Sequence, residues 1–423
     1  MKKYLLLILL SLTGYYVKSQ ELKNVILYSS LKQYDKAKLE IDSYMAKEKN
    51  AQLPDGWYYK AYVYNALGRS ETKPIAEGEQ DYQLAFDAIK KYAELDPKGK
   101  LTKEENNSTI YNTYYGFNDL GIKAYNAKDF AASFDCFKKT LEVHHYIYNN
   151  KIYGPNDLKL AAHDTDLVWN MVVLANELKN KEEGFVYKKM IADADMSDEK
   201  YVAVYDDLIV KYKKEGNAEL FTKYLAAAKK YFPADKEYWD TQDIDFALKG
   251  LENEDLFAKY EELLTRLPDN YMVVFNYGFE LSKYISSSDA KGKDIKGYKA
   301  KMETLFKKAI SIKNTVEANL LMSNIYYDSY FSYLDEISKI KGTKPEDNKA
   351  RNELKNLRNE TLAKAIPYAE EAVKQLSAME KLKATDKQNF KLVLEILTTA
   401  YKAADNTAKF EEYEKKRQEV EKL

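Results

Sequence analysis

The sequence predicts an all-α fold in which pairs of helices stack into a solenoid. Three observations predict it. Gly and Pro, the residues that break helices, number only 15 and 8 among 423 residues, against an average combined share of about 12%. Amphipathic segments separated by short turns recur along the chain, and several of them end in proline. No segment shows the apolar–polar alternation of a half-buried strand.

The composition excludes several classes of function. Hydrophobic residues make up 45% of the chain and charged residues 31%, a balance that rules out both a disordered chain and a multi-span membrane protein. A formal net charge of −1 argues against nucleic-acid binding, which needs a basic excess. The single cysteine excludes an internal disulfide framework and a zinc site built from several thiolates.

Residues 1–19 have the pattern of a signal peptide. Lys2 and Lys3 precede the apolar run Leu5–Leu12, and Ser19 supplies a small side chain at the expected cleavage point. The run is shorter than the roughly 20 residues that span a bilayer; a buried N-terminal helix is the alternative. No cysteine lies near the cleavage point to carry a lipid. We therefore expect an exported, unlipidated bacterial protein of the periplasm or of the periplasmic or outer face of the cell envelope.

A helix–turn–helix–proline unit recurs along the rest of the chain. Tyr231–Asp235 and Arg266–Asn270 have similar sequences, and their prolines lie about one 34-residue period apart. A third such ending closes at Pro97. Proline ends each second helix because it lacks an N–H group and disfavours the helical conformation in the residue before it.

These units resemble tetratricopeptide repeats (TPRs), and the chain resembles exported TPR proteins of Bacteroidetes-like bacteria. That family has a 34-residue period, aromatic and Leu–small positions in the first helix, a glycine at the turn and a closing proline. The best match runs from Glu199 to Pro233. Its first-helix face, turn glycine and close-contact alanine are Tyr205, Leu208 and Tyr212, then Gly216, then Ala228.

The other units follow the same order along the chain. The resemblance implies a right-handed α/α superhelix, and the matches give about nine helix pairs in one TPR-like domain over residues 20–423. In the second repeat, which begins near Trp57, residues 69–80 are expected to be an insertion. The units begin near Gln20, Trp57, Phe117, Asp164, Glu199, Trp239, Tyr271, Thr315 and Lys387.

Two further insertions interrupt this regularity. Residues 286–297 are expected to form an exposed polar loop. Residues 315–341 and 346–375 have the pattern of two long helices joined by a turn, so we expect a helical hairpin over about 326–364. Pro367 should kink or restart the second helix. The hairpin is either a lengthened repeat that packs on itself or a partner-binding projection.

Residues for catalysis or metal binding are scarce. His144 and His145 are adjacent, and adjacent helical residues point in different directions, so they are poor joint metal ligands; His163 lies beyond a turn. Asp164 or Thr165 should cap the helix that begins there. Cys136 lies among phenylalanines and is expected to be a buried, inert thiol. We predict no catalytic residue, no metal site and no cofactor.

The resemblance places function on the concave face, which in TPR arrays is lined by the first helices and holds a peptide or a partner protein. The basic clamp that some members use for a terminal carboxylate is not evident. We therefore predict a non-enzymatic protein–protein interaction scaffold or adaptor in the envelope. The residues expected to face the groove are Tyr58, Tyr62 and Asn65, then Asn118, Ile122, Tyr125 and Asn126, and then Met272, Phe275 and Phe279.

Two alternatives remain open at this point. An envelope glycan-binding protein could use the tyrosine doublets at 58–59, 114–115 and 326–327 to stack on sugars. The absence of a lipid-anchor cysteine and the presence of only 3 tryptophans count against it. An α/α-solenoid hydrolase is less favoured, because no acid–base pair stands out among the many evenly spread carboxylates.

Overall fold

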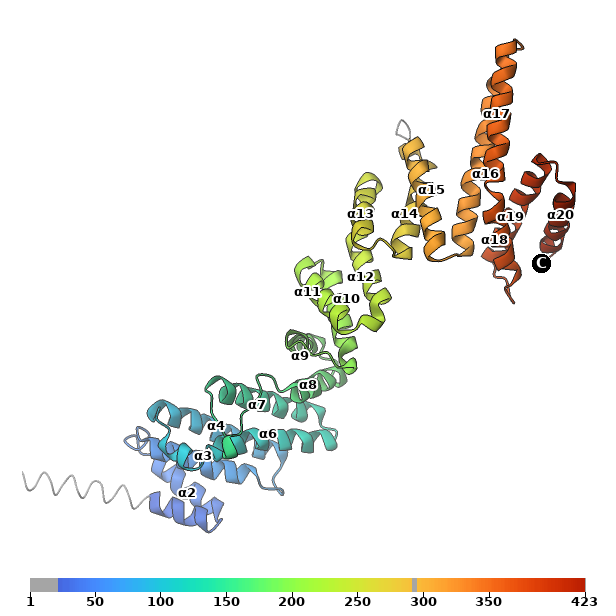
Figure 1. The fold of residues 1–423 in the computed structure, drawn as a ribbon. Helices are drawn as coiled ribbons and strands as arrows, with labels where there is room; N and C mark the ends of the chain where they lie inside the picture. Colours follow the sequence, from blue (N-terminus) through green and yellow to red (C-terminus); the bar gives the residue numbers. More distant parts are fainter. Residues whose placement is uncertain (1–21, 291–294, 423) are drawn as a thin grey trace, which may run out of the picture. The chain divides into compact units, whose positions relative to one another are not determined.

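The computed structural model describes residues 22–290 and 295–422, and the signal peptide expected at residues 1–19 lies outside them. The described residues contain helices and no strand, which confirms the all-α prediction. The helices follow one another as nine consecutive pairs in the described residues, with α5 and α17 as additional helices (Figure 1). Eight of these pairs start within about three residues of the expected units, whereas α6 begins at Ser108, well before the expected Phe117.

The chain divides into two compact units, with the boundary between Trp239 and Asp240. The described part of the first unit starts with a helix over residues 22–30. Its following α-helices are α2 Tyr34–Met45, α3 Pro54–Gly68, α4 Ile75–Leu95, α5 Lys100–Glu104, α6 Ser108–Asn126, α7 Phe130–Asn149, α8 Thr165–Glu177, α9 Lys181–Asp193, α10 Val202–Glu215 and α11 Ala218–Tyr231. Short 3-10 turns lie at Pro155–Asp157, Glu199–Tyr201 and Pro233–Asp235.

Four helices of the first unit, α7, α8, α9 and α11, begin at side chains that cap them. Asp129, Asp164, Asn180 and Asn217 each accept a hydrogen bond from a backbone N–H three residues ahead, at 3.1–3.3 Å. Such caps satisfy N–H groups that have no partner within the helix. Gly216 closes α10 with φ of +71°, a conformation that L side chains rarely adopt. The turn glycine and the cap at Asp164 were both expected from the sequence.

The second unit contains the later repeats. Helix α12 Lys236–Leu248 crosses the boundary between the units. The later α-helices are α13 Asn253–Arg266, α14 Tyr271–Ile285, α15 Ile295–Ile312, α16 Val316–Lys339, α17 Pro345–Ala363, α18 Ile366–Ser377, α19 Ala384–Ala403 and α20 Thr407–Glu421. One core cluster extends from Ile244 in α12 to Val420 in α20. The apolar faces of successive pairs therefore merge into a continuous core, as stacking of repeats requires.

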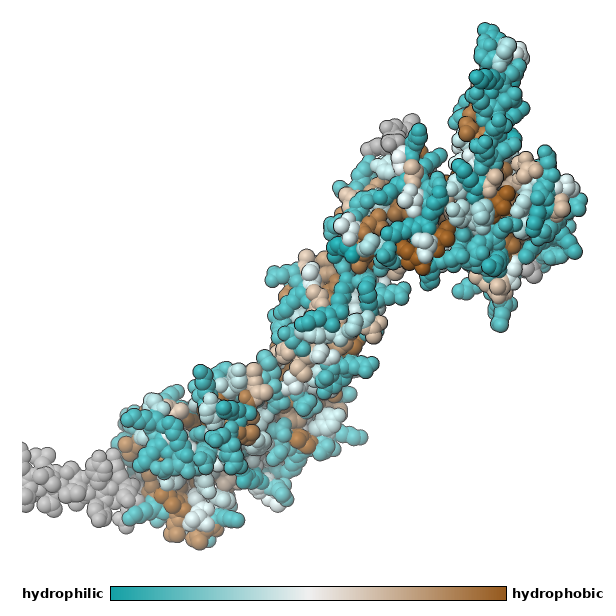
Figure 2. Space-filling model, viewed as in Figure 1, coloured by the Kyte–Doolittle hydropathy of each residue, from teal (hydrophilic) through white to brown (hydrophobic). Residues whose placement is uncertain are grey.

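Helices α16 and α17 form a long antiparallel hairpin over the segment where the sequence predicted one (Figure 1). Between Tyr327 in α16 and Leu362 in α17 no described residue is fully buried. The two helices contact each other there, and the Arg358 guanidinium lies 5.5 Å from the centre of the Tyr330 ring. The far end of the hairpin is mainly hydrophilic (Figure 2).

Two of the predicted boundaries differ in the structure. Helix α4 begins at Ile75, so the insertion expected over 69–80 is half as long, and its second part extends the helix. The loop expected over 286–297 contains a 3-10 turn at Ser288–Ala290, whose Ala290 is buried, and α15 already begins at Ile295; residues 291–294 lie outside the described part. Pro367 starts a new helix, α18, as expected of a proline in the first turn.

Candidate binding site

The first group of predicted groove residues lies on α3 and is mostly buried. Tyr62 is 37% exposed, but Tyr58 and Asn65 are 8% and 4% exposed. The Asn65 amide donates hydrogen bonds to the Thr109 carbonyl at 2.6 Å and to the Thr113 hydroxyl at 2.7 Å. The expectation that Asn65 faces an open groove is therefore wrong, because this side chain joins α3 to α6. Tyr58 is likewise mostly buried and packs near Tyr92.

The second predicted group lies on α6 and is largely open to solvent. Ile122 and Tyr125 are 46% and 44% exposed, Asn126 is exposed and Asn118 is half-buried. The Tyr125 ring lies 5.6 Å from the ring of Phe130, the first residue of α7. This contact holds a large aromatic side chain at the end of α6 without burying it.

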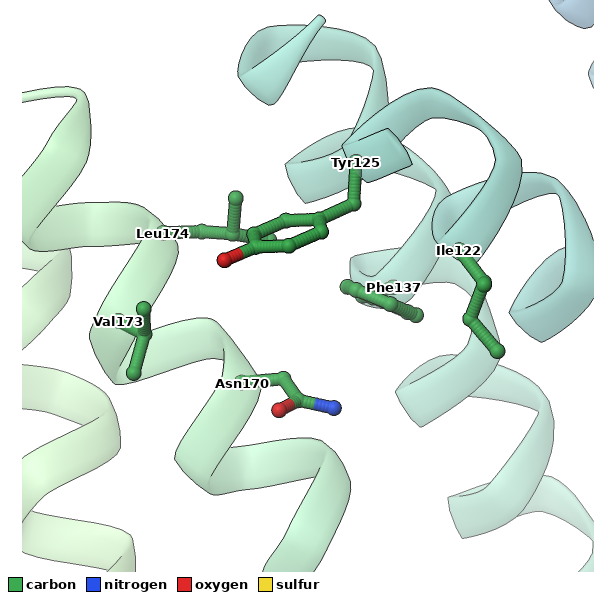
Figure 3. Close-up of a pocket in the computed structure, with 6 residues that line it drawn as sticks. All are labelled: Ile122, Tyr125, Phe137, Asn170, Val173 and Leu174. Atoms are coloured by element: carbon green, nitrogen blue, oxygen red, sulfur yellow. The ribbon is translucent and has the colours of Figure 1, made fainter. Parts of the chain in front are cut away.

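A small cavity lies where Ile122 and Tyr125 meet α7 and α8. Its volume is about 120 Å³. Figure 3 shows Tyr125 and Ile122 on one side and residues of α8 on the other. The complete lining is Ile122, Tyr125, Phe137, Asn170, Val173 and Leu174. The cavity therefore joins side chains from two successive first helices, α6 and α8, and one second helix, α7.

A hydrogen bond holds α8 in register with α6. The Tyr114 hydroxyl in α6 donates to Asp164, and the other carboxylate oxygen of Asp164 accepts from the Leu167 N–H at the start of α8. Burial, and then the hydrogen bond to Asp164, raise the pKa of Tyr114, so this phenol keeps its proton and remains a donor at neutral pH. The start of α8, two turns before the cavity, is thereby fixed to α6.

The cavity is lined mainly by apolar side chains. Apart from the Tyr125 phenol, no titratable side chain lines it, so it offers no acid–base pair. Its volume is below the 300–1,000 Å³ of typical small-molecule sites and fits a single apolar side chain. The Asn170 amide at its edge provides both a donor and an acceptor. An extended peptide needs such a combination of side-chain pocket and backbone partner.

Asn170 and Val173 line the cavity but were not predicted from the sequence. Both lie in the segment 167–175, in which all residues except Asn170 are apolar. The hydrophobic pattern of this segment therefore does not reveal which face of the helix is open to solvent. Asn170 is the only polar residue in that run and is exposed. An isolated amide in an otherwise apolar first helix is the signal that could have identified this face.

The third predicted group lies on α14, in the second unit. Phe279 is 41% exposed, whereas Met272 and Phe275 are half-buried. Tyr271, Phe275 and Phe279 form a row of nearly parallel rings, with centroids 5.3 Å and 6.4 Å apart. Phe275 also packs edge-on against Phe306 of α15. Only the end of this row is therefore open to solvent.

The remaining chemical candidates are buried or dispersed. Cys136 is fully buried, and burial raises the pKa of its thiol to about 12, which keeps it un-ionised as expected. Burial lowers the pKa of both His144 and His145. Within the described residues no group of three or more His, Cys, Asp or Glu side chains could hold a metal ion. No helix of the described chain has both the length and the apolarity needed to cross a bilayer.

The tyrosine doublets are mostly packing residues. Tyr326 and Tyr327 are 6% and 8% exposed, and their hydroxyls donate to Glu303 and Glu395. In the doublet at 114–115 only the second ring is open, at 45% exposure. Stacking on a sugar requires an accessible ring face, so the doublet at 326–327 cannot serve that role in this conformation.

The paired helices and the turn glycine Gly216 give the described residues an all-α helical-repeat fold, of the kind that the resemblance to TPRs predicts. No family model and no curated protein matches the sequence. Among solved structures, human IFIT1 in a dimer with PPP-AAAA matches over 94% of this chain and 89% of its own, with 14% identity and a TM-score of 0.23. The P58(IPK) TPR domain covers 90% of this chain and 99% of its own, with 12% identity and a TM-score of 0.25. Cut9–Hcn1 of the APC/C covers 95% and 87%, with 12% identity and a TM-score of 0.19.

Proposed function

We propose that this chain is a non-enzymatic interaction scaffold that binds an extended peptide segment of a partner protein along its first helices. The observation that carries the proposal is the cavity between α6 and α8, with two half-exposed apolar side chains, Ile122 and Tyr125, at its mouth. Exposed apolar side chains around a depression are typical of interaction surfaces. One apolar side chain of the peptide fills the cavity, and the Asn170 amide pairs with the peptide backbone.

Selection of peptides from a random library displayed on phage tests this proposal. The purified protein is the bait, and a selected peptide is then measured by fluorescence anisotropy. Ile122→Lys places a charge at the cavity mouth and should abolish binding, because burying an unpaired charge is strongly unfavourable. Val186→Lys is the matched control, since Val186 is an exposed apolar residue on the second helix α9. Equal loss of binding in both variants would refute the assignment of peptide binding to this cavity.

The proposal also places the protein in the bacterial cell envelope. Its support is the sequence of residues 1–19, with two lysines before a short apolar run. A chain that begins at Gln20 should stay in the cytoplasmic fraction, whereas the full chain should appear in the envelope and lose about 19 residues. Recovery of the full chain in the cytoplasm, with residue 1 or 2 at its N-terminus, would contradict export.

A further inference from the structure

A second, larger cavity lies in the first unit and shares no lining residue with the α6–α8 cavity. It has a volume of about 330 Å³ and lies between the helix at residues 22–30, α3 and α5. This volume is at the lower end of the range for small-molecule sites, large enough for an amino-acid side chain with its polar end group. Its polar and aromatic lining includes Ser29, Tyr58, Tyr59, Tyr62, Glu104 and Glu105.

The cavity carries negative charge without a matching cation. Glu104 and Glu105 both line it, and no Lys or Arg is among its lining residues. Neither carboxylate forms an ion pair with another described residue. Burial raises the pKa of Glu105, whereas hydrogen bonds from Thr109 and Tyr58 act in the opposite direction. The Thr109 N–H donates at 3.0 Å and its hydroxyl at 2.8 Å. Glu105 is thus held in place by neutral donors alone.

Three tyrosines form the aromatic part of the wall. Tyr58 and Tyr59 pack edge to face with centroids 5.2 Å apart, and Tyr62 is 37% exposed. Burial is the main cause that raises the pKa of each phenol, and nearby carboxylates add to it; at Tyr62 the charge of Arg69 acts in the opposite direction. All three rings are therefore neutral at pH 7. Neutral tyrosine rings beside carboxylates attract organic cations through both the ring faces and the negative charge.

The Ser29 side chain supplies an observation that is independent of the carboxylates. Ser29 lines the cavity and is only 6% exposed, and its hydroxyl has no hydrogen-bond partner. A buried hydroxyl without a partner is unfavourable and is uncommon in folded proteins. The neighbouring Ser30 hydroxyl, by contrast, donates to the Leu27 carbonyl at 2.8 Å. A bound donor group would satisfy Ser29.

We propose that this cavity binds an organic cation with N–H donors, a guanidinium or alkylammonium group. The carboxylates of Glu104 and Glu105 provide the countercharge, the rings of Tyr59 and Tyr62 contact the apolar stem and the cation, and Ser29 accepts one N–H. Metal ions are a poorer fit, because two carboxylates beside aromatic rings give too few oxygen ligands. A neutral sugar would leave the charge of the two carboxylates unbalanced.

Calorimetric titration of the purified protein with Nα-acetyl-arginine amide tests the proposal. The control ligand is Nα-acetyl-citrulline amide, which has nearly the same shape but no charge. We expect the arginine derivative to bind at least about tenfold more tightly, because a charged hydrogen bond is replaced by a neutral one, and to bind more weakly at higher salt. Equal affinities for the two ligands, or no binding of the arginine derivative at millimolar concentration, would overturn the proposal.

Matched substitutions locate the site. Glu104→Gln removes an exposed lining carboxylate and should weaken binding of the arginine derivative, whereas Glu182→Gln, at an exposed position on α9, should leave the affinity unchanged. Glu105→Gln should weaken binding roughly tenfold or more. An unchanged affinity in both lining variants would refute the assignment to this cavity. The comparison of the two ligands needs no variant, so it remains decisive if Glu105→Gln fails to fold.

The cation has two sources that the titration separates. Free agmatine carries the guanidinium as a small molecule, and the peptide acetyl-Gly-Gly-Arg-Gly-Gly-amide carries it as part of a chain. Tighter binding of the peptide identifies a basic side chain of a partner protein as the occupant. Equal or tighter binding of agmatine identifies a small-molecule amine. Both results support a cation site. If neither ligand binds, the cation site is refuted but the proposed peptide site at the α6–α8 cavity is not, because the two cavities share no lining residue.

Discussion

Gly121 of α6 lies directly beneath the ring of Phe137 in α7. A Cβ atom at position 121 would lie 2.6 Å from two carbon atoms of that ring, closer than side chains approach in folded proteins. The Ser133 hydroxyl donates to the Gly121 carbonyl at 2.8 Å, so the two helices are in close contact at this point. Phe137 also forms part of the α6–α8 cavity. The spacing of this helix pair and the shape of the cavity therefore depend on one glycine.

Substitution of this glycine should destabilise the first unit. We expect Gly121→Ala to reduce the free energy of unfolding by about 1–3 kcal/mol, because overpacking moves Phe137 or separates the helices. Gly184 in α9 is the matched control, since its Cβ would meet only the Ala175 Cβ, at 3.5 Å. Gly184→Ala should be neutral or stabilise by about 0.4–1 kcal/mol. Urea unfolding followed by circular dichroism measures both, and equal effects of the two substitutions would contradict the close-contact account.

Asn65 should contribute to stability rather than to binding. Its amide donates two hydrogen bonds across α3 and α6, so Asn65→Ala should lower the free energy of unfolding by about 1–3 kcal/mol. Asn126 is exposed at the end of α6, and Asn126→Ala should change stability little. Urea unfolding of the two variants checks this difference. If Asn65→Ala unfolds like the wild type, Asn65 does not hold the helices together.

Mild acid should loosen α7. Burial is the largest cause that lowers the pKa of His144; Asp164 opposes it, and His145 and His163 add to it. A histidine whose pKa is lowered by folding binds fewer protons in the native state, so stability is lost as pH falls through the unfolded value near 6.5. Hydrogen exchange of α7 peptides, corrected for intrinsic rates, should report less protection at pH 5.5 than at pH 7.5.

The matched variant for this pH effect is His144→Gln, which removes the buried imidazole and keeps a polar side chain. The loss of protection in α7 between pH 7.5 and 5.5 should be smaller in the variant than in the wild type. An equal loss in both proteins would assign the effect to other groups. Greater protection at pH 5.5 in the wild type would contradict the sign of the prediction.

The outer part of the hairpin should be dispensable for folding. Residues 328–361 include no buried side chain, and Tyr330 lies across from Arg358, so a short glycine-rich turn can replace residues 331–357. We expect the unfolding midpoint to change by an amount equivalent to less than about 1 kcal/mol, because little apolar area is lost from the core. Thermal unfolding by circular dichroism measures it. A large destabilisation would show that the hairpin stabilises the repeats beneath it.

The sequence predicts where the helices begin and end better than it predicts which way their side chains point. Pro233, Pro268 and Gly216 lie where a repeat ends or turns, and the helices stop there. These residues act through their own backbone, so their effect is local and visible in the pattern. The start of α4 at Ile75 was missed because the segment before Asp81 has no distinct apolar face.

The residues of the binding site were only partly predictable, for a different reason. Ile122 and Tyr125 were identified from the match of α6 to the repeat, and both are exposed. Asn65 was assigned by the same reasoning, yet it is buried and its amide donates a hydrogen bond to the Thr109 carbonyl of α6. The facing residues of α8 lie in a run that is apolar except for Asn170. Side-chain orientation depends on neighbouring helices, and a single-helix pattern does not contain that information.

The most direct test of the interaction-scaffold account compares two tyrosines of equal exposure. Tyr125 on α6 and Tyr148 on α7 are both 44% exposed, but only Tyr125 lines the α6–α8 cavity. The affinity of a selected peptide should fall roughly tenfold or more in Tyr125→Ala, as for other central aromatic contacts, and should stay unchanged in Tyr148→Ala. Unchanged binding in Tyr125→Ala, or an equal loss in both variants, would contradict the account.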